Sequence, residues 1–147
     1  MTLQSLAGRT LERIEPDRAQ IARLLAAAER NVADAQIAGV SAENRFDAAY
    51  KAIMQLAMVA LNANGWRTRT SVPGHHRTVL QTLALTVAVA VAPEKVRLLD
   101  ALRKQRNLSD YAGEMVPDAA VAECLASAKE LSGHVRGWFA AHRPELP

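Results

Sequence analysis

The stretch that decides the fold runs from Ser41 to Asn64 and reads SAENRFDAAYKAIMQLAMVALNAN. It opens with a capping serine and an early acid, Glu43, and Asn64-Gly65 closes it, as is typical of a helix. Its apolar side chains cover most of the helix circumference: Phe46, Tyr50, Ile53, Met54, Leu56, Ala57, Met58, Val59 and Leu61. A helix that is apolar on nearly every side is buried on most sides. We therefore place this segment at the centre of the protein.

Helical segments are predicted on both sides of this central helix. Pro16-Asp17 indicates the start of a helix that runs to about Ile37, before Gly39. Three more follow: from about His75 to Ala92, from Pro93 to about Tyr111, and roughly from Asp118 to His142. Val87, Val89 and Val91 alternate with alanine at a strand-like period, but a lone strand would have no partner, so a helix is preferred there. Five helices with short connections predict an all-α, up-and-down bundle.

Length and composition limit the class of protein. A chain of 147 residues has the size of one domain, and its 50% hydrophobic and 22% charged residues are ordinary globular values. Cys124 is the single cysteine, which excludes an internal disulfide. The longest apolar stretch, 79–92, is shorter than the roughly 18–20 residues of a membrane span. We expect a single helical domain over 1–147 that is soluble, cytoplasmic and not bound to a membrane.

The positive charge of the chain gathers in its middle. The formal net charge is only +3, but the stretch from Gly65 to Arg77 holds three arginines, two histidines and no acid. The stretch from Glu94 to Arg106 holds five lysines and arginines against two acids. A basic centre on an acidic background is the footprint expected for a phosphate-bearing ligand. Solvated faces of a loop and a helix would give the same pattern.

Arg106 is a polar residue in an apolar position. Leu98, Leu99 and Leu102 define the buried arc of the predicted helix 93–111, and Arg106 projects into that arc. A guanidinium among leucines must reach a partner, a ligand or water, because an unpaired buried charge costs several kcal/mol. The alternative is a surface pair with Asp110, four residues on, although an acid C-terminal to its base is the weaker orientation.

Other polar residues gather near this turn. Asn107, Asp110 and Tyr111 surround it together with Arg106. On the central helix, Asp47 projects onto the arc that carries Met54 and Met58. Its carboxylate either stabilises the N-terminal end of the helix by interacting with the helix dipole or faces the basic turn around Arg106.

The histidines do not predict a metal site. His75 and His76 are adjacent, whereas a helical metal-binding face needs a spacing of three or four. His134 and His142 lie off the main apolar stripe of the last helix, and Cys124 lies within it. We therefore expect no metal and no cofactor, surface positions for His134 and His142, and a packing role for Cys124.

The segment from Leu98 to Tyr111, LLDALRKQRNLSDY, resembles the motif helix of the HEPN superfamily (higher eukaryotes and prokaryotes nucleotide-binding domain). The segments RFDAAYKA, from Arg45, and GHHRTVL, from Gly74, are also similar to parts of such domains. The resemblance covers about 41–142, with the helix at about 16–38 as an added N-terminal element.

The resemblance implies a site. In catalytic members an arginine, followed after four to six residues by a histidine, forms a metal-independent ribonuclease site, usually across a homodimer cleft. Here Arg106 stands at the arginine position, Asn107 at the polar position beside it, and Tyr111 where the histidine is expected. Tyrosine, with an ordinary pKa of about 10, is a poor general base. Arg106 and Tyr111 are the candidate catalytic pair, and the candidate ligand-binding residues are Asn107, Asp110, Asp47, His76 and Arg103.

Three functional hypotheses follow. The first is a HEPN-like homodimer that binds RNA or a nucleotide, with weak or no ribonuclease activity. The second is a metal-independent, toxin-type endoribonuclease in which His75 or His76 supplies the proton chemistry. The third is a non-catalytic, dimeric protein-interaction bundle in which Arg106 is a structural anchor. The resemblance also implies a nucleotidyltransferase-like antitoxin as a possible partner.

Overall fold

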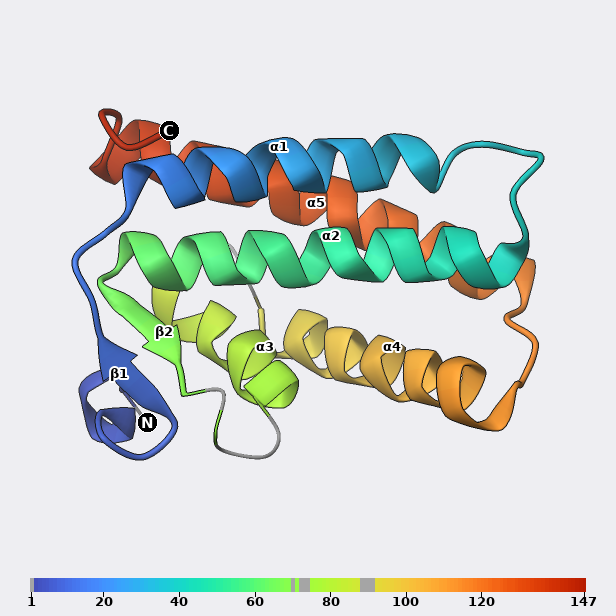
Figure 1. Cartoon of the computed structure of the whole chain (residues 1–147), viewed down its shortest axis with the longest axis horizontal. Coiled ribbons are helices and arrows are strands. Elements are labelled where there is room, and N and C mark those ends of the chain that lie inside the picture. The colour runs from blue at the N-terminus through green and yellow to red at the C-terminus, as the bar shows by residue number, and fades with distance from the viewer. Residues whose placement is uncertain (1, 70, 72–74, 88–91) are drawn as a thin grey trace.

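The computed structural model describes residues 2–69, 71, 75–87 and 92–147. This part of the chain forms an all-α bundle, as predicted, with one small sheet at its edge (Figure 1). Its helices are α1 (Arg18–Asp34), α2 (Ala42–Ala63), α3 (His75–Thr86), α4 (Pro93–Ala112) and α5 (Asp118–His142). The remaining elements are a 3-10 turn, η1 (Gln4–Leu6), and the strands β1 (Leu11–Arg13) and β2 (Trp66–Thr68).

Helix α2 is the centre of the bundle. It packs against the other four helices, with α1 and α5 on one side of it and α3 and α4 on the other (Figure 1). Nearly all of its apolar side chains belong to one continuous core that also takes in residues of the four surrounding helices. The predicted central position is confirmed. Met58 is the exception among the predicted core residues, since it is 36% exposed.

Most helix boundaries agree with the predicted ones, and the largest differences are at the ends of α1 and α3. Helix α1 begins at Arg18 because Asp17 caps it, its carboxylate accepting a hydrogen bond of 3.1 Å from the Gln20 N–H. It ends at Asp34, three residues before the predicted Ile37. The chain continues in tight turns there, with the Ile37 N–H bonded to the carbonyl of Asp34 and the Val40 N–H to that of Ile37.

Within the described residues, the ambiguous valine-rich segment is helical only up to Thr86. Helix α3 covers the first part of the predicted range 75–92 and ends at Thr86, with Val87 buried just beyond it. The remaining part, 88–91, lies outside the described residues. Leu99 and Leu102 of α4 are buried as predicted, and Leu98 is half-buried.

The small sheet is not predicted by the sequence pattern. Strands β1 and β2 pair antiparallel, with Leu11 opposite Thr68 and Arg13 opposite Trp66. Each strand has three residues, which is too short for alternation to show, and the partners lie far apart in the chain. Leu11, Leu61 and Trp66 bury each other in a second, smaller core at this end. The sheet therefore fastens the N-terminal segment to the end of α2.

A buried asparagine ties α1 to α2. Asn62 is 5% exposed, and its Oδ1 accepts a hydrogen bond of 3.0 Å from the Asp17 N–H. Its Nδ2 donates to Gln20 Oε1 at 3.2 Å. Both polar ends of this amide are thereby satisfied by the first turn of α1, which fixes where α1 starts against α2.

We expect Asn62→Ala to lower the free energy of unfolding by about 1–2 kcal/mol, because it removes two hydrogen bonds and leaves their partners partly buried. Chemical denaturation monitored by circular dichroism measures this loss. The matched control is Asn44→Ala on the exposed face of α2, for which we expect a change within about 0.5 kcal/mol. Equal losses in the two variants would contradict the role of Asn62.

Candidate functional site

Arg106 lies between α4 and α2, held by an acid from each helix. Its side chain is 24% exposed, so it is neither fully buried nor flat on the outside. Its Nε is 2.8 Å from Asp110 Oδ2, on the same helix, and 3.6 Å from Asp47 Oδ1, on α2. Both arrangements left open by the sequence therefore occur together: the pair with Asp110 forms, and Asp47 faces the basic turn.

Two buried donors in this cluster have no hydrogen-bond partner among the described residues. The Nε–H of Arg106 is close to both carboxylates without being aligned for a hydrogen bond to either. The hydroxyl of Tyr50, a residue that is only 3% exposed, is the second unpartnered group. The guanidinium carbon of Arg106 lies 5.7 Å from the centre of the Tyr50 ring. Orphaned buried donors are uncommon and costly, so this pair marks a candidate site.

Tyr50 belongs to the site but is not predicted from the sequence, because its position on α2 fits the apolar pattern of a packing residue. The signal that could have found it is its spacing. Tyr50 is three residues from Asp47, which places both side chains on one face of α2. That face looks toward α3 and α4, where the cationic side chains gather.

Burial controls the protonation of Tyr50. Desolvation raises the pKa of its hydroxyl to about 12, although the positive charges of Arg106 and Arg103 act in the opposite direction. The group therefore keeps its proton throughout the neutral range. It can donate a hydrogen bond to an anion, and it cannot serve as a base there.

His76 joins the cluster from the first turn of α3. Its ring centre is 6.4 Å from that of Tyr50, and it meets the His75 ring edge-on at 4.6 Å. Burial lowers the pKa of His76 below 6.5, and the neighbouring His75, Arg106 and Arg103 lower it further. The structure thus brings His76 to the cluster as a neutral imidazole at pH 7.

Arg103 faces this cluster but is bound to another acid. Its Nε donates to Asp100 Oδ1 at 2.9 Å, and Lys104 approaches the other oxygen of that carboxylate at 3.5 Å. Burial alone would raise the pKa of Asp100, but the hydrogen bonds and charges of Arg103 and Lys104 outweigh it and lower this pKa. Arg103 therefore supplies positive potential to Tyr50 and His76 without a direct bond to either.

Tyr111 is not brought together with Arg106. A helix turns by about 100° per residue, so five residues separate the two side chains by about 140° around α4. Tyr111 is 80% exposed, and Leu108 and Met115 are exposed near it in the chain. Asn107 is half-buried and projects about 100° away from Arg106. Of the residues implied by the family motif, only Arg106 sits in the cluster.

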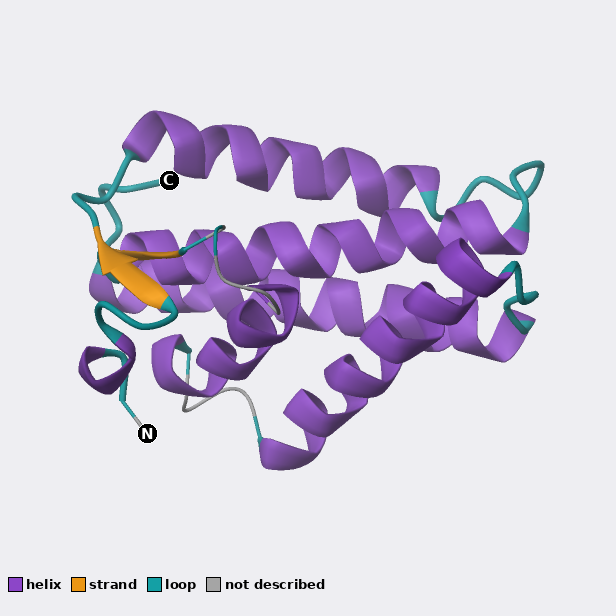
Figure 2. Cartoon of the chain, turned by 60° about the horizontal axis from the view of Figure 1, so that its bottom comes forward, coloured by secondary structure: helices purple, strands orange, loops and turns teal. Residues whose placement is uncertain are grey.

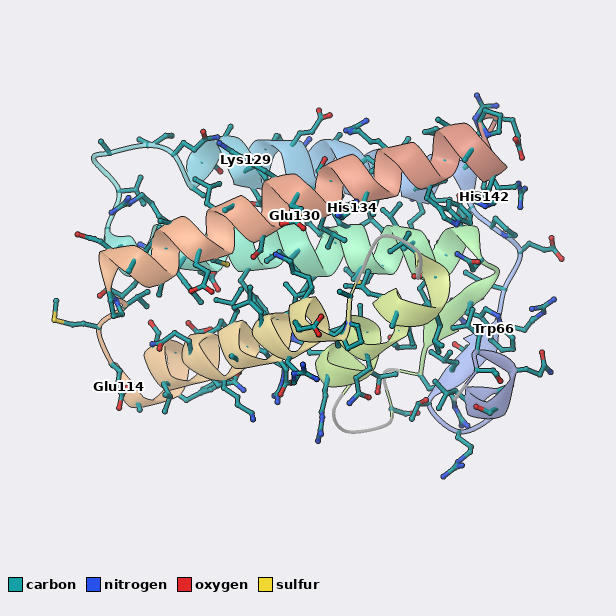
Figure 3. The ribbon with its side chains drawn as sticks, turned by 180° about the vertical axis from the view of Figure 1, so that it is seen from behind. Trp66, Glu114, Lys129, Glu130, His134 and His142 are labelled. Carbon is teal, nitrogen blue, oxygen red and sulfur yellow. The ribbon has the colours of Figure 1, made fainter. Side chains whose placement is uncertain are left out.

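The other histidines and the cysteine lie outside this cluster. Cys124 is fully buried and packs in the core, as predicted, and burial raises its pKa to about 12. His134 is half-exposed, with its Nε2 3.5 Å from Glu130, which also binds Lys95 of α4 at 2.9 Å. Figure 3 shows Glu130 and His134 side by side on α5, and His142 at the end of that helix. This group links α5 to α4.

The residues that the structure describes contain no group of three or more histidine, cysteine, aspartate or glutamate side chains arranged to hold a metal ion. Within the same residues, no helix combines the length and the apolar character needed to cross a membrane. Comparisons with protein-family models, curated proteins and solved structures found no match to this chain.

The lowered pKa of His76 predicts a loss of stability in acid. The unfolded chain takes up this proton near pH 6.5, and the folded protein takes it up only at lower pH. In between, the unfolded state binds more protons, so the free energy of unfolding falls as the pH drops from about 7 to about 5. We expect His76→Gln to make this decline shallower. Denaturation curves at a series of pH values measure it.

The control for this experiment is His142→Gln, an exposed histidine at the far end of α5. A decline that is reduced equally by both substitutions would show that the buried position of His76 is not its cause.

The unpartnered hydroxyl of Tyr50 predicts that its removal costs little stability. No hydrogen bond is lost in Tyr50→Phe, and a buried polar atom disappears, so we expect a melting temperature that is unchanged or higher. Thermal unfolding of the two proteins measures it. A loss of more than about 1 kcal/mol would mean that the hydroxyl has a partner in the folded protein.

Proposed function

We propose that this protein binds RNA or a nucleotide through a phosphate group at Arg106. The observation that carries the proposal is the pair of buried donors, Arg106 Nε–H and Tyr50 O–H, neither of which makes an aligned hydrogen bond to the described residues, although two carboxylates lie near the guanidinium. A phosphate offers several acceptor oxygens and could satisfy both. Arginine is suited to this role because its planar guanidinium binds phosphate oxygens in pairs.

The present partners of Arg106 are ones that a phosphate could replace. Asp110 is about one-third exposed and stands C-terminal to the arginine on the same helix, the weaker orientation for such a pair. The pair is partly exposed, 24% at Arg106 and 33% at Asp110, so water screens part of its attraction. Asp47, from α2, would hold the guanidinium in place while Asp110 gives way. Tyr50 would then donate to the phosphate, and Arg103 would add positive potential.

The resemblance to HEPN domains supports the same ligand class through Arg106. Tyr111 departs from the motif both in residue type and in direction, since it projects from another side of α4. An exposed tyrosine is suited to stacking on a base, as in proteins that bind single strands. Binding with weak or no cleavage is therefore the function that fits the arrangement best.

We expect Arg106→Ala to weaken the binding of a fluorescently labelled single-stranded RNA by about 10- to 100-fold, because a charge-assisted contact is lost. Fluorescence anisotropy over a series of salt concentrations measures it. For single strands each phosphate contact adds about 0.7 to the slope of log affinity against log salt. The slope should therefore fall by about that amount in the variant.

The matched control is Arg23→Ala, which removes an exposed arginine from α1. It should leave both affinity and slope nearly unchanged, while Tyr50→Phe should weaken binding without loss of stability. RNA affinity that is equal in Arg106→Ala and Arg23→Ala would contradict the proposal, as would the absence of any salt-dependent binding.

A second candidate is metal-independent RNA cleavage, favoured by the neutral His76 in the same cluster. A neutral imidazole can accept a proton from a ribose hydroxyl, which the protonated Tyr50 cannot do. Cleavage of RNA in the presence of a chelator, abolished in both His76→Ala and Arg106→Ala, would establish this activity. Intact RNA after prolonged incubation with the wild-type protein would leave binding alone.

A further inference from the structure

A hollow of about 440 Å³ lies between α3 and α4, away from the Arg106 cluster. Figure 2 shows these two helices meeting at an angle beneath the bundle. The residues that line the hollow are Arg77, Leu80, Gln81, Val96, Arg97, Asp100, Ala101 and Lys104. Arg97 and Lys104 project from α4 on the side roughly opposite to Arg106, as seven residues return a helix almost to the same face. The hollow is therefore a separate place in the fold.

The rim of this hollow is cationic, and two of its three cations are free to bind an anion. Arg77 has no acidic partner among the described residues, and Arg97 has only a distant contact of 3.9 Å with Glu94. Both side chains of that contact are about three-quarters exposed, so it holds Arg97 weakly. The guanidinium groups come from different helices and flank the same space.

The one acid of the hollow, Asp100, does not oppose an anion. Its carboxylate is bound by Arg103 on one oxygen and by Lys104 on the other. These contacts lower its pKa and balance its negative charge within the protein. An incoming anion therefore meets the potential of Arg77 and Arg97, and the nearest loosely paired carboxylate is that of the exposed Glu94, 3.9 Å from Arg97.

Apolar side chains line the rest of the hollow. Leu80 is fully buried, Val96 is half-buried, and Ala101 adds a methyl group between the charged residues of α4. Gln81 contributes an amide that can donate and accept hydrogen bonds. A hollow of this volume lies within the usual range of small-molecule sites, which combine an apolar lining with a few polar groups.

We propose that the hollow between α3 and α4 binds a phosphate monoester with a planar or apolar body, about the size of a nucleoside monophosphate. Arg77 and Arg97 bind the phosphate group. Leu80, Val96 and Ala101 contact the body, and Gln81 bonds to its polar edge. This site does not depend on Arg106, and it stands or falls separately from the RNA-binding proposal.

The test uses the full chain and adenosine 5′-monophosphate as the probe, with binding measured by isothermal titration calorimetry. We expect saturable binding that weakens at least about tenfold in the double variant Arg77→Gln/Arg97→Gln, since two charge-assisted contacts are lost. The matched control is Arg23→Gln/Arg30→Gln, which makes the same change of net charge on exposed positions of α1. The titrations are repeated in the Arg106→Ala background, in which binding at the hollow should persist and should still be weakened by Arg77→Gln/Arg97→Gln.

Ligand fragments separate the two halves of the proposal. Adenosine, which lacks the phosphate, should bind too weakly to measure, and ribose 5-phosphate should bind more weakly than the whole nucleotide. The proposal is overturned if adenosine binds as well as the nucleotide, or if inorganic phosphate matches it. Equal weakening by the α1 control pair, or a loss confined to Arg106→Ala, would also overturn it.

Discussion

The burial of α2 on nearly all sides is the constraint on which the rest of the structure depends. Four helices must cover its apolar surface, and they form the bundle by doing so. Any polar group that α2 carries inward must then be satisfied by a neighbouring helix, because water is excluded. Asn62 meets this requirement through the first turn of α1. Asp47, which is partly exposed, forms an ion pair with Arg106 of α4. The hydroxyl of Tyr50 has no hydrogen-bond partner among the described residues.

The candidate site follows from that unmet requirement. Arg106, Tyr50 and His76 lie close together where α2, α3 and α4 meet. Burial raises the pKa of Tyr50 and lowers that of His76, and the charge of Arg106 acts to lower both. The positive charges disfavour a proton on His76, and burial keeps the proton on Tyr50. The result is a neutral imidazole, a protonated phenol and a guanidinium with an unused donor. Such a set is complementary to a phosphate group, whose oxygens can accept hydrogen bonds from both donors.

The sequence predicts the helices well because they have strong local signals. Helix starts are marked by Ser41 and Pro93, and a helix end is marked by Gly113, through capping and backbone geometry. The apolar composition of α2 predicts that this helix is buried. The strands β1 and β2 have no such signal, since their pairing joins segments of three residues from distant parts of the chain. The alternating valines favour a strand by period alone, and the helical assignment rests on the lack of a partner.

The candidate site is predicted only in part from the sequence. Arg106, Asp47 and Asp110 stand out because charged residues interrupt apolar arcs, and the structure does bring them together. Tyr50 gives no such signal, because a tyrosine in an apolar helix looks like packing until its hydroxyl is seen to lack a partner. Tyr111 stands at the spacing from Arg106 that the family pattern leads one to expect, and the geometry of α4 directs the two side chains about 140° apart.

The most direct test of the central claim is to observe the Nε–H of Arg106 itself. In ¹⁵N-labelled protein, arginine Nε–H signals can be followed by NMR during titration with a short single-stranded RNA, and the signal lost in Arg106→Lys identifies the one of interest. The account predicts that this signal shifts saturably and moves in step with the binding curve. A signal that stays in place while those of exposed arginines move would contradict it.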